Sequence, residues 1–318
     1  MRRRDFLTLA GTVAWPLVAR AQQPEMPVIG YLSENTVSAD IHGAFLRGMS
    51  ALGYSEGKNF AIEDRHKPRS LPEAAADLVR RKVNVIFASN PGALSAAIKA
   101  TTSIPVVGVD LESDPVAKGY VQSIARPGGN VTGMFLDIPQ LCGKHLGLLK
   151  EIFPGLSRIA ILGIPGTNAP QFAATETATR GAGVEAEVLE VRTSDDLQGA
   201  LEKARVRPVD AGILLSSPFM FQYSKLIAEL ALAKRLPLIS LFAEFPRNGG
   251  LMAYGPNLDD MYRRCGEYVG KVLRGAKPSE LPLQRPETFD LIINLKTATA
   301  IGVELPARLQ LLANELVE

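Results

Sequence analysis

A set of polar and aromatic side chains stands at or near the carboxyl ends of the predicted strands of this chain, and their types suggest ligand-binding chemistry. The set is Ser33, Asn35, Ser89, Asn90, Asp114, Asn168, Ser217, Phe219, Glu244, Tyr254 and Asn257. Hydroxyls and backbone N–H groups at helix starts suit a ligand carboxylate. Asp114 or Glu244 suits a ligand ammonium, and Phe219, Phe221 or Tyr254 could pack an apolar or aromatic group. Each Ser, Asn or Asp taken singly is as well explained as a helix cap, so only the whole set favours a site.

The sequence shows no comparable pattern for an enzyme active site. The sequence contains no Gly-x-Ser-x-Gly, His-Glu-x-x-His, Gly-x-x-x-x-Gly-Lys or Gly-x-Gly-x-x-Gly motif at a position that would suit catalysis or phosphate binding. The three histidines, His42, His66 and His145, lack companions at metal or triad spacing, so we interpret them as surface or packing residues. We therefore expect no enzyme, no metal and no cofactor.

The elements that must position the set alternate between strand and helix in the first part of the chain. Strands are predicted at 28–32, 60–63, 83–88 and 104–109. Helices are predicted at about 40–53, 70–82 and 92–101. Strands that are apolar along their length and separated by helices indicate a parallel sheet covered on both faces.

A second alternating unit follows a turn-rich stretch at 125–130, which we interpret as a crossing between lobes. Its strands are predicted at 159–163, 184–191, 211–215 and 238–241, and its helices at about 139–153, 171–180, 195–205 and 223–234. A second glycine break at 248–250 precedes a strand at 251–255, a helix from Asn257, a strand at 289–294 and terminal helices.

This pattern predicts an α/β fold of two doubly wound parallel-sheet lobes joined by a multi-crossing hinge. The expected parts are an N-terminal lobe of 26–127 plus 257–288, a C-terminal lobe of 131–250, and a final crossing strand with terminal helices at 289–318. Ligands favour clefts between domains and the carboxyl ends of parallel strands. Hinged lobes of this kind close around their ligands.

Composition limits the function classes. The chain has 318 residues, 46% of them hydrophobic, and a formal net charge of +2. That length suits two domains, and the near-balanced charge argues against a nucleic-acid partner. The two cysteines, Cys142 and Cys265, both fall on predicted helices. We expect free buried thiols, although an oxidising compartment would permit a disulfide that staples the hinge region.

Residues 1–21 have the pattern of an export signal. Arginines at positions 2–4 precede a short apolar run at 7–18, and Ala19-Arg20-Ala21 is a cleavage pattern. The Arg-Arg-Asp-Phe-Leu order resembles the twin-arginine type. The run is shorter than the about 20 apolar residues of a membrane span. We therefore predict cleavage near Ala21 and a mature protein that is free in the periplasm and does not span the membrane.

Several segments together resemble a known family. They are Pro-Val-Ile-Gly-Tyr-Leu after the leader, Leu-Gly-Tyr-Ser-Glu-Gly-Lys-Asn at 52–59, Ala-Arg-Pro-Gly-Gly-Asn-Val-Thr-Gly at 125–133, Gly-Gly-Leu-Met-Ala-Tyr-Gly-Pro-Asn at 249–257 and Leu-Ile-Ile-Asn-Leu-Lys-Thr-Ala at 291–298. The chain resembles the ABC-transporter substrate-binding proteins of the tryptophan/tyrosine-uptake type. The resemblance implies a type I periplasmic-binding fold with three crossings, amino-acid-like ligands, and permease and ATPase subunits as partners. Asp114-Pro115-Val116 and 254–257 match family segments.

The sequence thus predicts a periplasmic solute-binding protein of an ABC importer, closing on a small organic solute that is amino-acid-like or aromatic. A periplasmic ligand sensor that partners a membrane receptor is the alternative. An exported enzyme is a third class, for which convergent acid, base and nucleophile groups would be needed.

Overall fold

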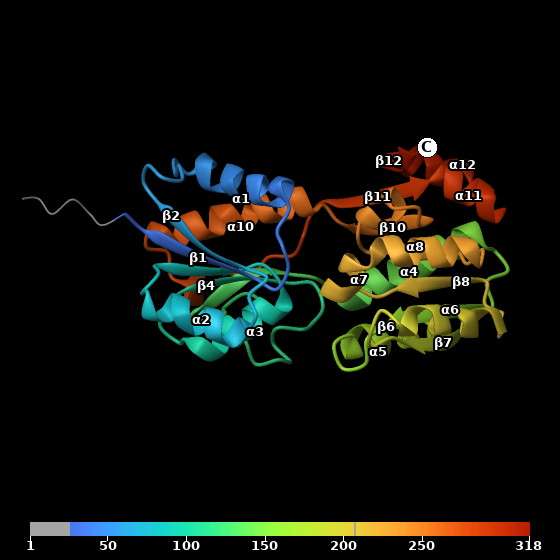
Figure 1. Cartoon of the computed structure of the whole chain (residues 1–318), viewed down its shortest axis with the longest axis horizontal. Coiled ribbons are helices and arrows are strands. Elements are labelled where there is room, and N and C mark those ends of the chain that lie inside the picture. Colours follow the sequence, from blue (N-terminus) through green and yellow to red (C-terminus); the bar gives the residue numbers. More distant parts are fainter. Residues whose placement is uncertain (1–25, 207) are drawn as a thin grey trace, which may run out of the picture.

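The computed structural model describes residues 26–206 and 208–318, so the predicted export signal lies outside the described residues. Figure 1 shows two lobes side by side, each a sheet flanked by helices. None of the helices in these two ranges is long and apolar enough to cross a membrane.

The N-terminal lobe holds a five-stranded parallel sheet in the order β2-β1-β3-β4-β5. Its strands are β1 (Val28–Ser33), β2 (Ala61–His66), β3 (Val85–Ala88), β4 (Val106–Asp110) and β5 (Val131–Phe135). Helices α2 (Leu71–Arg80) and α3 (Pro91–Ala100) pack with one face of the sheet. Helices α1 (Ala39–Ala51) and α10 (Leu258–Leu273) pack with the other.

The C-terminal lobe holds a seven-stranded sheet in the order β12-β11-β10-β9-β8-β6-β7. Its strands are β6 (Arg158–Gly163), β7 (Glu185–Glu190), β8 (Ala211–Leu214), β9 (Leu238–Ser240), β10 (Met252–Pro256), β11 (Phe289–Asn294) and β12 (Glu315–Val317). All pairs are parallel except β10 with β11. Its helices are α4 (Ile138–Ile152), α5 (Ala169–Gly181), α6 (Asp196–Val206), α7 (Pro218–Gln222), α8 (Ser224–Ala233), α9 (Glu244–Arg247), α11 (Leu295–Ile301) and α12 (Ala307–Leu312).

The predicted fold class is confirmed, but the sheet pairing corrects the lobe boundaries. β5 pairs with β4, so 131–135 belong to the N-terminal lobe and the chain first crosses after Phe135, not at 125–130. Asn130 explains the difference, because its Nδ2 donates to Thr101 O and Ile104 O and fixes the turn beside β4. The strands at 252–256 and 289–294 both pair within the C-terminal sheet, which also gains β12.

Along the chain, α10 stands between β10 and β11, two strands of the C-terminal lobe. In space it belongs to the N-terminal lobe, where it lies along α1 (Figure 1). Two glycines allow this close contact. A Cβ on Gly266 would lie 2.1 Å from the carbonyl oxygen of Phe45, and a Cβ on Gly48 would lie 1.8 Å from that of Arg263. Both distances are far below van der Waals contact with rigid backbone, so the two helices can approach this closely only with glycine at both positions.

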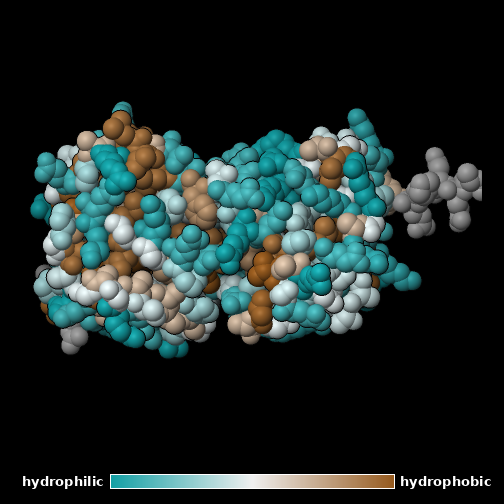
Figure 2. Space-filling model, turned by 180° about the vertical axis from the view of Figure 1, so that it is seen from behind, coloured by the Kyte–Doolittle hydropathy of each residue, from teal (hydrophilic) through white to brown (hydrophobic). Residues whose placement is uncertain are grey.

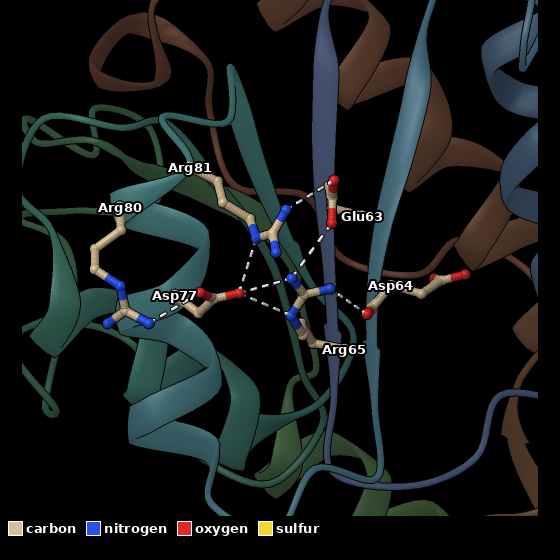
Figure 3. Close-up of polar contacts among 6 residues, drawn as sticks. All are labelled: Glu63, Asp64, Arg65, Asp77, Arg80 and Arg81. Carbon is tan, nitrogen blue, oxygen red and sulfur yellow. Dashed lines mark hydrogen bonds and ion pairs between the residues drawn. The ribbon is translucent and has the colours of Figure 1, made fainter.

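The edge strand β2 carries charged side chains that join it to α2. Asp77 accepts hydrogen bonds from Arg65 Nη2 at 2.6 Å, Arg80 Nη2 at 2.9 Å and Arg81 Nε at 3.0 Å. Figure 3 shows the three guanidinium groups gathered around this carboxylate, with Glu63 facing Arg65 and Arg81. Charges on an edge strand also discourage pairing with other chains.

We predict that Gly266→Ala lowers the free energy of unfolding by about 1–3 kcal/mol, because the methyl group forces α1 and α10 apart. Gly199→Ala is the matched control, since nothing lies within 4 Å of a Cβ there and the residue is in α6. Alanine in an open helical position should stabilise the fold by up to about 1 kcal/mol. Urea unfolding of both variants measures the difference, and shifts of the same sign would contradict the packing.

The network around Asp77 predicts a pH dependence. Hydrogen bonds from Arg65 and then Arg81 lower the pKa of Asp77 to about 2. A carboxyl whose pKa is lower when folded stabilises the fold above its unfolded pKa, and this contribution disappears as pH falls through about 2. Unfolding free energies measured from about pH 4 to about pH 2 should therefore fall less steeply for Asp77→Asn than for the unaltered chain. Parallel profiles would contradict this role.

Candidate functional site

A cavity of about 160 Å³ lies between the two lobes. The N-terminal lobe contributes the loops after β1, β3 and β4 with the starts of α1, α3 and α10, and the C-terminal lobe contributes α7 and the loop after β9. The lining residues are Ser33, Asn35, Thr36, Val37, Ser38, Ile41, Ser89, Asn90, Pro91, Val109, Leu111, Glu112, Pro218, Phe221, Phe242, Leu258 and Tyr262. Seen from behind, the surface is mostly polar and a notch separates the lobes at the lower edge (Figure 2).

The polar side of this cavity is built at the start of α3. Asn90 Oδ1 accepts from the backbone N–H of Ala93 at 2.9 Å, and Asn90 Nδ2 donates to Ser33 Oγ at 3.2 Å. This joins the ends of β1 and β3. The first turn of α3 contains no acidic residue of its own, but the carboxylate of Glu34 lies beside Gly92 in that turn, near the partial positive charge of the helix N-terminus.

The apolar side of the cavity is aromatic. Phe221 of α7 and Phe242 after β9 meet edge to face with ring centroids 5.1 Å apart. Tyr262 of α10 donates its hydroxyl to the carbonyl oxygen of Ser89 at 2.8 Å, which turns its ring toward the cavity lining. Aromatic rings supplied by both lobes can enclose a flat solute group.

Glu112 is the only charged residue of the cavity lining. Its side chain is buried, and the loop that carries it is shaped by Asp110, which accepts from the N–H groups of Glu112 at 2.8 Å and Ser113 at 2.9 Å. Burial raises the pKa of Glu112 well above its ordinary value, and the nearby charges of Asp110 and Glu34 raise it further. A cation entering the cavity would therefore meet one buried carboxyl.

Four of the residues expected from the sequence line this cavity: Ser33, Asn35, Ser89 and Asn90. Three others hold the C-terminal lobe together. Asn168 is fully buried and bonds Ile164 N and Ser216 O, Ser217 caps α7, and Phe219 packs on Tyr223 with centroids 4.6 Å apart. Each of these three side chains therefore has a structural role.

The remaining four expected residues line other cavities around the hinge. Glu244 and Asn257 line one of about 180 Å³, where Asn257 also caps α10. Asp114 lines one of about 400 Å³ beside the first crossing, and its carboxylate accepts from Val116 N. Tyr254 lines a third, of about 320 Å³, and stacks on Phe289. A ligand role for these four stays a prediction.

The sequence analysis did not select Tyr262, Leu258 or Ile41. Tyr262 and Leu258 belong to the apolar stripe of α10, and Ile41 to that of α1, so periodicity alone makes them core positions. The available signal was their nearness to the caps Asn257 and Ser38, since the first turn of a helix that starts at the cleft must face it.

His145 and the two cysteines, for which the sequence suggested no chemistry, are buried in the structure. His145 is buried with its Nε2 2.6 Å from the carbonyl oxygen of Tyr254, and burial lowers its pKa to about 4, so it is neutral at ordinary pH. Cys142 and Cys265 are both buried and free, and they form no disulfide.

A two-lobed α/β protein with a cavity between its lobes and several crossings has the architecture of a solute-binding clamp. The family model for ABC transporter substrate binding proteins matches residues 25–317, and the chain belongs to this family. It is a substrate-binding protein and not an enzyme.

The chain is also similar to several individual proteins. The chain is 25% identical over 276 residues to a tyrosine-binding protein of Clostridioides difficile (strain R20291), which covers 82% of this chain and 76% of the relative. A Streptococcus pneumonia ABC domain in complex with L-Trp has a TM-score of 0.83 and 20% identity, covering 92% of this chain and 99% of that one. The ligand-free, open structure of a Clostridium difficile substrate binding protein with adhesive properties has a TM-score of 0.71 and 22% identity, with coverage of 92% and 99%.

Proposed function

We propose that this chain is the periplasmic solute-binding component of an ABC importer and that it closes on an amino acid with an aromatic side chain. The cavity between the lobes is the observation that carries the proposal. It combines the N-terminus of α3 for a carboxylate, a buried carboxyl for an ammonium, and rings from both lobes for a flat group. The relatives with tyrosine or tryptophan in their names support the same ligand class.

The mechanism in this proposal is binding and closure, without a covalent step. A solute that contacts both lobes stabilises the closed arrangement because it binds that arrangement more tightly than the open one. Phe221 and Phe242 would come with the C-terminal lobe and Tyr262 with the N-terminal lobe, so the solute is completely enclosed only when the lobes meet. The permease and ATPase subunits would then receive the closed form.

We predict that L-tyrosine, L-tryptophan or L-phenylalanine raises the melting temperature of the purified mature chain, since a ligand that binds only the folded state stabilises it. Amino acids with small polar side chains should have little effect. A screen in which no aromatic amino acid shifts the melting temperature would contradict the proposed ligand class.

The two phenylalanines Phe242 and Phe219 allow a matched test. Phe242→Ala removes a ring from the cavity and should weaken binding of the aromatic solute about tenfold, equivalent to about 1.4 kcal/mol. Phe219→Ala removes a ring of similar size that packs inside the C-terminal lobe, and should lower stability while leaving the affinity unchanged. Isothermal titration calorimetry gives both affinities, and the reverse order would place the site elsewhere.

Export also forms part of the proposal, and the leader provides its test. Replacing the arginine pair by Arg3→Lys and Arg4→Lys should leave uncleaved precursor in the cytoplasm, because the twin-arginine route reads that pair. Fractionation followed by mass spectrometry should locate the unaltered protein in the periplasm with its N-terminus near residue 22. Unchanged export of the double variant would contradict the twin-arginine assignment.

A further inference from the structure

Glu112 is a buried acidic residue in the lining of the cavity between the lobes. The residue is only 5% exposed, and none of the described residues donates a hydrogen bond to its carboxyl group or forms an ion pair with it. Asp110, two residues earlier in the chain, accepts hydrogen bonds from two backbone N–H groups and from the hydroxyl of Ser113. Of these two neighbouring carboxyl groups, the one that lines the cavity is the one without a partner.

The loop after β4 holds Glu112 in this position. Asp110 fixes the backbone of both Glu112 and Ser113, and the side chains of Leu111 and Glu112 are both buried, so the turn places Glu112 at the cavity. A buried carboxylate without a partner is costly, so ionisation of Glu112 becomes favourable only when a cation arrives from outside.

The cavity lining contains no lysine or arginine, and the nearby Lys118 acts on Asp110, whose pKa it lowers. The titratable groups around Glu112 are Glu34 on the loop after β1, Asp110 at the end of β4 and Tyr262 on α10. The C-terminal lobe contributes only the uncharged Pro218, Phe221 and Phe242 to the cavity. Burial and the two acidic neighbours all favour the protonated form of Glu112 in the empty cavity.

We propose that Glu112 recognises the ammonium group of the solute and that solute binding drives a proton from Glu112 into solvent. This inference rests on the proposed function of the cavity as an amino-acid site. The balance is simple: a neutral carboxyl group and an ammonium ion combine into a carboxylate–ammonium pair, and one proton leaves. Affinity for amines is then coupled to pH, and acids that lack the amino group are rejected.

The proton linkage has a defined sign. Below the pKa of the free protein's Glu112, binding must displace a proton, so the dissociation constant rises as pH falls. The rise approaches about tenfold per pH unit where the free form is protonated and the bound form is ionised. The solute's ammonium group stays charged over this range, so the change belongs to the protein.

The test is calorimetric titration of the full mature chain at several values from about pH 5 to about pH 8, in buffers of different ionisation enthalpy. The probes are L-tyrosine and L-tryptophan, each compared with its analogue lacking the amino group, 3-(4-hydroxyphenyl)propionate or 3-(indol-3-yl)propionate. We expect up to one proton released per amino acid bound, none for the analogues, and at least tenfold weaker binding of the analogues at the upper pH.

Three variants test whether the effects come from the carboxyl group of Glu112. Glu112→Gln should abolish the proton release and the preference for the amino acid, while its melting temperature without solute stays equal or rises because a strained buried acid is gone. Glu34→Gln removes one negative neighbour and should move the pH profile toward lower pH. Glu56→Gln is exposed, removes the same charge outside the cavity lining and should leave both readouts unchanged.

The outcomes distinguish a failure of the proposed function from a failure of the role proposed for Glu112. If amino acids and analogues bind equally well, without proton release and without an effect of Glu112→Gln, the role of Glu112 is wrong and the aromatic site stands. If neither the amino acids nor their analogues bind, the proposed function fails and this inference fails with it.

Discussion

The structure depends on one geometric constraint: the carboxyl ends of the strands in both lobes face each other across the gap. The cavity consequently collects residues just past β1, β3 and β4 from one lobe and past β8 and β9 from the other. Three crossings keep this arrangement, because the chain leaves β5 for α4, returns through β10 to α10, and leaves again into β11. The glycine contact between α1 and α10 anchors the second of these crossings, so lobe packing and cleft geometry are linked.

This constraint explains which site residues the sequence could predict. Ser33, Ser89 and Asn90 directly follow strands of one sheet, and local order alone brings them to the same edge. Asp114 lies only two residues beyond Glu112, but the turn around Asp110 points the two in different directions, toward separate cavities. Sequence spacing cannot distinguish Glu112 from Asp114, because their directions depend on the hydrogen bonds that the side chain of Asp110 accepts from its own loop. Likewise, 125–130 has the composition of a crossing, and only the pairing of β5 with β4 identifies it as a turn within one lobe.

The cavity divides the recognition of a solute among groups of different physical character. Aromatic rings from both lobes supply apolar contact that is complete only on closure, and the N-terminus of α3 supplies a fixed partial positive charge. Glu112 supplies a carboxyl group that is protonated in the empty cavity and ionises when the ammonium of a solute pairs with it. In this account affinity and selectivity for amino acids both come from that pair.

A crystal structure of the mature protein grown with L-tyrosine or L-tryptophan tests the central claim most directly. The account predicts the amino acid in the cavity between the lobes, its ring between Phe242 and Tyr262, its ammonium within hydrogen-bond distance of Glu112, and its carboxylate at the start of α3. An amino acid bound instead in the cavity beside Asp114, or with its ammonium away from Glu112, would contradict it.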